Sequence, residues 1–162
     1  MITPEAAKLL RRTGFRTLRL GLETADMEWR QGLDQKVTAG EFERAVGFLK
    51  TAGFTSRELG VYLLAGLPGQ SADSVRQAIQ AAHDQGVDCS LSEYSPLPHT
   101  AVWEQAKAHS DYDLEAEPLF QNNSILPCWD EVERAQMPEL KKMVKEFRRE
   151  IFLTGLTGST RL

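Results

Sequence analysis

The chain has 162 residues, of which 19 are basic and 23 are acidic, so its formal net charge is −4. Neither sign forms a long block, which argues against nucleic acid or an anionic membrane as a partner. No apolar run approaches the ~20 residues that span a bilayer, and no apolar signal segment opens the sequence, so we expect a cytoplasmic protein. The length suits one domain that can bury a core.

Metal and hydrolase sites have little support in the sequence. The two cysteines, Cys89 and Cys128, are too few for a disulfide scaffold or a four-ligand metal site. The three histidines are scattered, with no second ligand at helical spacing, and no serine lies in a nucleophile elbow. We therefore predict no metal ligands and no catalytic residue in this chain.

The first quarter of the chain predicts a helix, a strand and a second helix. Thr3-Pro4-Glu5 has the residue types of a helix start, and the helix should end at Gly14. Residues 17–23 alternate leucines with other residues, which is typical of a strand. A short helix is expected over 27–33.

The middle of the chain predicts two further units of helix and strand. Residues 38–52 begin with capping-box spacing and carry apolar residues at helical intervals. The apolar run Leu59 to Ala65 predicts a strand covered on both faces. A helix capped by Ser71 should then lead into a third strand over 87–94.

The remaining residues predict helices and a long connection. A modest helix is expected over 101–108, a polar irregular segment over 110–127, and a final helix from Pro138 with a frayed tail over 155–162. We divide the chain into residues 1–108 and an extension of residues 109–162.

The alternation of elements predicts an α/β fold with parallel strands and right-handed crossovers. Such strands form either an open sheet or part of a barrel, and three strands cannot close a barrel. The strand at 17–23 should have an unpaired edge, which native proteins normally cover. We interpret the chain as a fragment of a larger fold, with self-association through that edge as a hypothesis.

Ligands of parallel α/β folds gather at the carboxyl ends of the strands, where this sequence places Glu23, the loop 66–70 and Tyr94-Ser95. The two glycines of the loop allow a tight turn, and free N–H groups near Ser71 and Ala72 would offer a helix N-terminus to a ligand. An ordinary strand-to-helix turn explains the same residues, because Gly-Leu-Pro-Gly is neither GxGxxG nor a P-loop.

Two charged residues are further candidates. The carboxylate of Glu23 can accept hydrogen bonds from two hydroxyls, as in a ribose, or it can be a solvated strand end. Lys36 can pair with a carboxylate or phosphate, or remain solvated.

The ordered set of motifs resembles the second half of a radical S-adenosylmethionine enzyme barrel. It covers about residues 2–105 and comprises Leu18-Arg19-Leu20-Gly21-Leu22-Glu23-Thr24, Lys36-Val37-Thr38, Tyr62-Leu63-Leu64-Ala65-Gly66-Leu67-Pro68-Gly69-Gln70, and Tyr94-Ser95-Pro96-Leu97-Pro98-His99-Thr100. The resemblance implies a partial (β/α) barrel of TIM-like type, in which these strands are the last three of six units, followed by C-terminal helices.

The resemblance also implies cofactor contacts. Glu23 would bond the ribose hydroxyls of S-adenosylmethionine, and Lys36 would approach its methionine carboxylate. Leu64 and Gly66 would line the adenine.

The backbone around Tyr94 and Ser95 would bond the edge of that adenine. The family's 4Fe-4S cluster is held by a CxxxCxxC loop that this chain lacks, so the cluster would belong to an N-terminal half of the intact protein, and the substrate is unknown. We expect this chain to be inactive alone. The alternative is a catalytically inactive β/α module for nucleotide binding or protein–protein assembly.

Overall fold

The computed structural model describes residues 2–23 and 40–157 of the chain. Its elements in chain order are α1 (Pro4–Arg12), β1 (Leu18–Glu23), α3 (Glu41–Thr51), β2 (Leu59–Ala65), α4 (Ala72–Asp84), β3 (Asp88–Glu93), α5 (Trp103–His109), the 3-10 turns η1 (Pro118–Gln121) and η2 (Asn123–Ile125), α6 (Glu131–Ala135) and α7 (Met137–Thr157). The helix expected over 27–33 lies outside the described residues.

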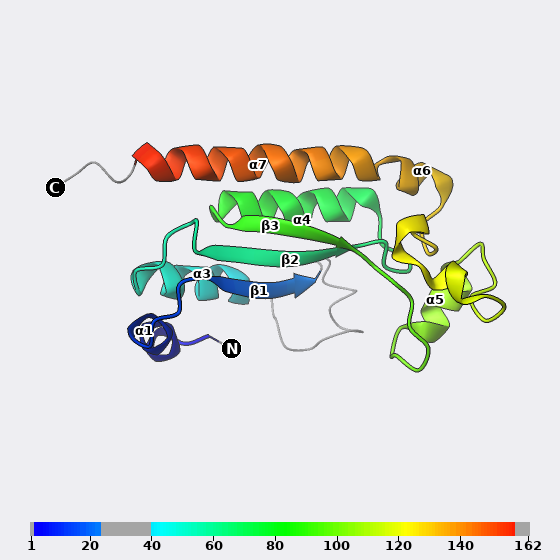
Figure 1. Cartoon of the computed structure of the whole chain (residues 1–162), viewed down its shortest axis with the longest axis horizontal. Helices are drawn as coiled ribbons and strands as arrows, with labels where there is room; N and C mark the ends of the chain where they lie inside the picture. The colour runs from blue at the N-terminus through cyan, green and yellow to red at the C-terminus, as the bar shows by residue number, and fades with distance from the viewer. Residues whose placement is uncertain (1, 24–39, 158–162) are drawn as a thin grey trace.

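The three strands form one parallel sheet in the order β1-β2-β3, which confirms the α/β class. In register, Leu18 lies opposite Leu59 and Gly60 lies opposite Asp88, so all three carboxyl ends meet at one edge of the sheet. Figure 1 shows α5, the 3-10 turns and α6 gathered beyond that edge, and α7 lying along α4 and β3.

One face of the sheet carries the core. Leu59, Val61 and Leu63 are buried completely or almost so, within one cluster that includes apolar residues of α3, α4 and α7. Alternate side chains of a strand point to opposite faces, so Tyr62 lies on the face of β2 opposite these core residues. Its side chain is 50% exposed. The prediction that β2 is covered on both faces is therefore wrong for the described residues.

The ends of the helices refine the predictions. Thr3 caps α1 by accepting from the N–H of Ala6, as expected. Helix α3 begins at Glu41 with Gly40 as its N-cap, at a positive φ of 79° that glycine readily adopts, and without a side-chain cap. Thr38 of the expected capping box lies outside the described residues. Helix α7 continues to Thr157, past the start of the predicted frayed tail.

The outer edge of β3 is covered by α7. The Arg148 guanidinium donates to the carboxylate of Asp88 at 2.8 Å and to the main-chain carbonyl of Cys89 at 2.9 Å. Lys141 of the same helix forms an ion pair with Glu93. None of the described helices is long and apolar enough to cross a membrane.

Candidate functional site

The candidate site lies at the carboxyl ends of the strands, where β1 ends with Glu23, β2 leads into Gly66 and β3 leads into Tyr94-Ser95. The parallel register brings these positions to the same edge of the sheet, because Glu23 lies opposite Leu63 and Ala65 lies opposite Glu93. Only the main chain of Glu23 is described, and Lys36 lies outside the described residues.

Gln70 organises the loop that follows β2. Its buried side chain accepts from the N–H of Gly66 at 2.9 Å and from the N–H of Leu67 at 3.1 Å. Its Nε2 donates to the Leu64 carbonyl at 3.0 Å. The N–H groups of Gly66 and Leu67 are therefore bonded within the loop itself. The Gln70 carboxamide takes the place at these groups that a ligand could otherwise take.

Gly66 is required by a contact with the C-terminal extension. Its φ is 94°, a conformation that side chains rarely adopt, and a Cβ built there would lie 2.8 Å from the Leu126 Cδ2. Leu126 itself has a φ of 48° and is almost fully buried. The Leu126 side chain thus fills the space that a side chain at position 66 would need.

The N-terminus of α4 is also occupied. Ser71 caps it as predicted, accepting from the N–H of Ser74 at 3.1 Å. The N–H of Ala72, which we expected to be free for a ligand, donates to the Glu133 carboxylate at 2.6 Å. That expectation was wrong, because the carboxylate from α6 already accepts this N–H and complements the positive end of the α4 dipole.

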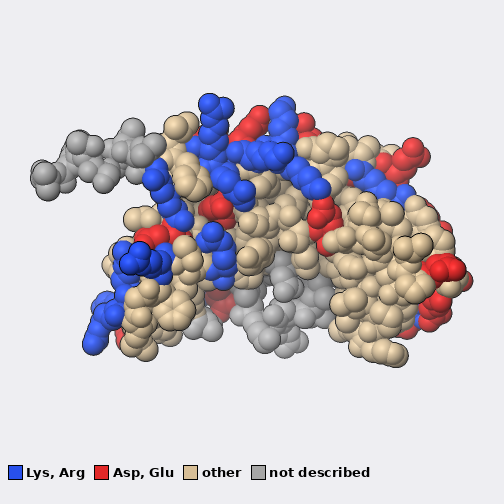
Figure 2. All heavy atoms as spheres, in the orientation of Figure 1, with Lys and Arg blue, Asp and Glu red and all other residues tan. Residues whose placement is uncertain are grey.

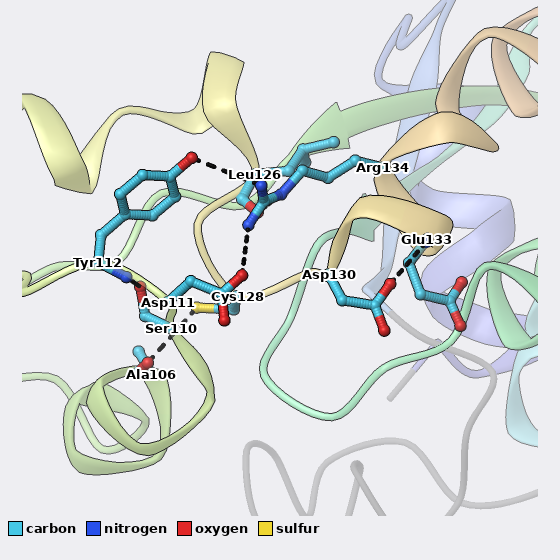
Figure 3. Close-up of polar contacts among 9 residues, drawn as sticks. All are labelled: Ala106, Ser110, Asp111, Tyr112, Leu126, Cys128, Asp130, Glu133 and Arg134. Atoms are coloured by element: carbon cyan, nitrogen blue, oxygen red, sulfur yellow. Dashed lines mark hydrogen bonds and ion pairs between the residues drawn. The ribbon is translucent and has the colours of Figure 1, made fainter.

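Arg134, the neighbour of Glu133, ties the extension together (Figure 3). Its guanidinium donates to the carbonyl of Leu126 at 3.3 Å and forms an ion pair with Asp111 at 3.2 Å. It also lies over the ring of Tyr112. These contacts join Asp111, Tyr112 and Leu126 to α6 within the extension.

Tyr94 and Ser95 are engaged inside the chain. The N–H of Tyr94 donates to the Ala65 carbonyl at 2.8 Å, and the Ser95 hydroxyl donates to the Gln121 carbonyl at 2.5 Å. The Tyr94 hydroxyl is buried without a partner among the described residues. Burial, with a smaller contribution from the thiol of Cys128, raises the pKa of Tyr94 to about 12, so the ring stays neutral.

Leu64 lies on the same face of β2 as Tyr62, is partly buried, and packs against a second apolar cluster. That cluster contains Leu67, Tyr94 and Trp103 and lies under α5 and the extension. Leu64 and Gly66 thus lie at the carboxyl end of β2, and their place beside an adenine stays a prediction.

The two cysteines are free thiols. Cys89 lies in β3 and Cys128 in the extension, and both are buried. Burial raises the pKa of Cys89 to about 12, with a further contribution from the carboxylate of Asp88, and raises the pKa of Cys128 to about 11. Within the described residues, no group of three His, Cys, Asp or Glu side chains could hold a metal ion.

Sequence reasoning missed three residues that shape this site. Gln70 was part of a recognised motif, and a polar residue closing a glycine turn is a signal that could have been used. Glu133 and Leu126 carried no comparable signal, because their partners Ala72 and Gly66 are about sixty residues away in the chain.

No protein-family model matches the chain, and no curated protein matches it at a significant level. Among solved structures, the chain is similar to coproporphyrinogen III oxidase (HemN) from Escherichia coli, described as a radical SAM enzyme, with a TM-score of 0.59 and 19% identity. The alignment covers 88% of this chain and 30% of that enzyme. At this identity the similarity shows a shared fold.

Proposed function

We propose that the chain is the cofactor-cradling half of a radical S-adenosylmethionine enzyme. One observation carries the proposal: motifs that resemble the family lie at the carboxyl ends of three adjacent parallel strands, in chain order, on a fold similar to that of HemN. Ligands of parallel α/β folds bind at this edge. The cofactor would lie across the ends of β1, β2 and β3.

The sheet would be the last half of a partial barrel of six β/α units. Its strands are parallel and adjacent in chain order, as neighbouring units of such a barrel are. The partner of this sheet would be the N-terminal half of the enzyme, which would place the remaining strands beside β1 and hold the 4Fe-4S cluster. The cluster would supply the electron that cleaves S-adenosylmethionine to a 5′-deoxyadenosyl radical and methionine.

The described residues fit this cofactor in part. The N–H groups of Gly66 and Tyr94 are bonded within the chain, so they are not the donors that would hold the adenine. The adenine would instead lie against the side chain of Leu64 and the main chain of Ser95. Glu23 would accept the ribose hydroxyls, and Lys36 would pair with the methionine carboxylate.

The experiment that tests this proposal is a titration of the chain with adenosine and with S-adenosylmethionine, followed by ligand-observed NMR. Both should bind weakly and with similar affinity, because no cluster holds the methionine end. Glu23→Ala should weaken both about tenfold by removing charge-assisted hydrogen bonds to the ribose. Glu146→Ala, which removes an exposed carboxylate from α7, is the matched control and should have no effect. Unchanged affinity in Glu23→Ala would refute the ribose assignment.

A second candidate, a catalytically inactive assembly module, is favoured by a different observation. Gln70 and Glu133 already occupy the N–H groups that a nucleotide could use at the end of β2 and the start of α4. This module would use for assembly the edge of β1 that pairs with no strand among the described residues. It predicts no adenosine binding at millimolar concentration together with concentration-dependent association in light scattering.

A further inference from the structure

A shallow groove of about 400 Å³ lies next to the proposed cofactor site. Residues 95–97, just after β3, form one wall, and residues 118, 119 and 121–123, at η1 and the start of η2, form the other. We call it the 95/118 groove. Its position outside the carboxyl end of β3 is one where ligands of parallel sheets bind.

The two walls are held together by hydrogen bonds at their base. The Ser95 hydroxyl donates to the Gln121 carbonyl at 2.5 Å. The Gln121 side chain donates in turn to the carbonyl of Leu114, which is fully buried in the second apolar cluster. The groove is therefore anchored to packed structure and is pre-formed in the chain.

The lining of the 95/118 groove is uncharged. Charged residues make up 26% of the chain, yet none of the described residues that line the groove is Lys, Arg, Asp or Glu. Figure 2 shows basic side chains gathered over α7 and the α1 end on one face of the molecule, while the end with α5 shows mostly uncharged atoms and has acidic side chains along its outer margin. A phosphate or carboxylate ligand would find no counter-charge in this groove.

The apolar part of the lining is exposed. Leu97 is 57% exposed on one wall, and Leu119 is 73% exposed on the other, each beside a proline. The two leucines give both walls exposed apolar surface, which an apolar side chain of a ligand would cover.

Besides Ser95 and Gln121, the polar lining consists of two asparagines whose carboxamides have unused hydrogen-bonding capacity. Asn122 accepts from the N–H of Ser124 at 2.8 Å, which leaves its NH₂ group available. The side chain of Asn123 has no hydrogen-bond partner within the described part of the chain. Carboxamides both donate and accept, so they match a ligand that offers N–H and C=O groups together.

We propose that the 95/118 groove binds an extended, uncharged peptide segment, so that the substrate of the proposed enzyme is a peptide. Its substrate role rests on the proposed function, whereas the binding itself does not. A peptide main chain repeats N–H and C=O groups for Asn122 and Asn123, and its apolar side chains would pack on Leu97 and Leu119.

The test is a titration of the 162-residue chain with the peptide acetyl-Ala-Leu-Ala-Leu-Ala-amide, followed by ligand-observed NMR without any cofactor. Leu119→Ala and Asn123→Asp should each weaken binding about fivefold, by removing apolar contact and by replacing a donor with a charge. Val132→Ala, at a side chain 71% exposed on α6, and Gln80→Glu on α4 are the matched controls and should bind as the parent chain does.

Three outcomes would overturn the proposal. The first is no binding at millimolar peptide, and the second is equal binding by the two groove variants and the parent chain. The third is equally tight binding of N-acetylleucine methylamide, which would identify a small amide in place of a peptide. Peptide binding with no adenosine binding would refute the proposed function and leave the groove assignment intact.

Discussion

At the scale of single residues, one carboxamide decides the conformation of the turn after β2. The sequence indicated a turn at the glycines of the loop 66–70. In the structure the Gln70 side chain holds that turn, because it bonds three main-chain groups. A motif shows that a turn has an unusual conformation, yet a residue inside the motif can either hold the turn or bind a ligand. Only the bonded partners distinguish the two.

Gln70→Met should lower the free energy of unfolding by about 3 kcal/mol, because it leaves buried main-chain groups without partners. Tyr94→Phe is the matched control, since it removes a buried hydroxyl that has no partner within the described structure. Its effect should lie within about 1 kcal/mol of zero or be stabilising. Urea denaturation followed by circular dichroism measures both. A large loss in Tyr94→Phe would mean that its hydroxyl has a partner.

At the scale of elements, helix starts could be predicted where the cap is local. Thr3 and Ser71 cap α1 and α4 as their sequences indicate. The same reasoning could not find Glu133 on α4, because that contact depends on where α6 packs. Helix α6 itself was missed, since five residues carry too little periodicity to be recognised.

An ion pair joins α1 to the start of β2. The Arg11 guanidinium lies 2.8 Å from the Glu58 carboxylate and also lies over the ring of Phe54. The N–H of Thr55 donates to the same carboxylate, and these bonds lower the pKa of Glu58 to about 2. A carboxyl group whose pKa is lowered in the folded chain stabilises that chain above its unfolded pKa.

Stability should therefore fall as the pH decreases from about 4.5 towards 2, the interval between the unfolded and folded pKa values of Glu58. Glu58→Gln should remove about 1 kcal/mol at neutral pH, a modest amount because solvent screens this pair, and should flatten the acid dependence. Glu117→Gln, at an exposed carboxylate, is the control. Thermal unfolding at several pH values measures the effect, and parallel acid curves for both variants would contradict it.

At the scale of the whole molecule, the order of strands and helices could be predicted because each unit has its own periodicity and stop signals. The parallel sheet follows from that alternation. The exposure of Tyr62 in β2 within the described structure could not be predicted, since a continuous apolar run does not show which face of the strand a neighbour covers. The division at residue 108 and the six-unit barrel stay predictions.

The isolated chain should not assemble an iron–sulfur cluster. Its two thiols are buried and remain protonated, whereas cluster ligands are thiolates supplied by three or four cysteines. Anaerobic reconstitution with iron and sulfide should leave no charge-transfer absorption in the blue region. A thiol reagent should react with Cys89 and Cys128 only after denaturation, which serves as the control. A stable blue-region band that survives gel filtration would contradict this prediction.

The contacts that Arg148 and Lys141 make with β3 limit where a further strand can join the sheet. The arginine already occupies a main-chain acceptor on the outer side of β3, so another strand would have to displace α7 to pair there. Among the described residues, β1 pairs with β2 alone. A strand that extends this sheet without displacing α7 would therefore add beside β1.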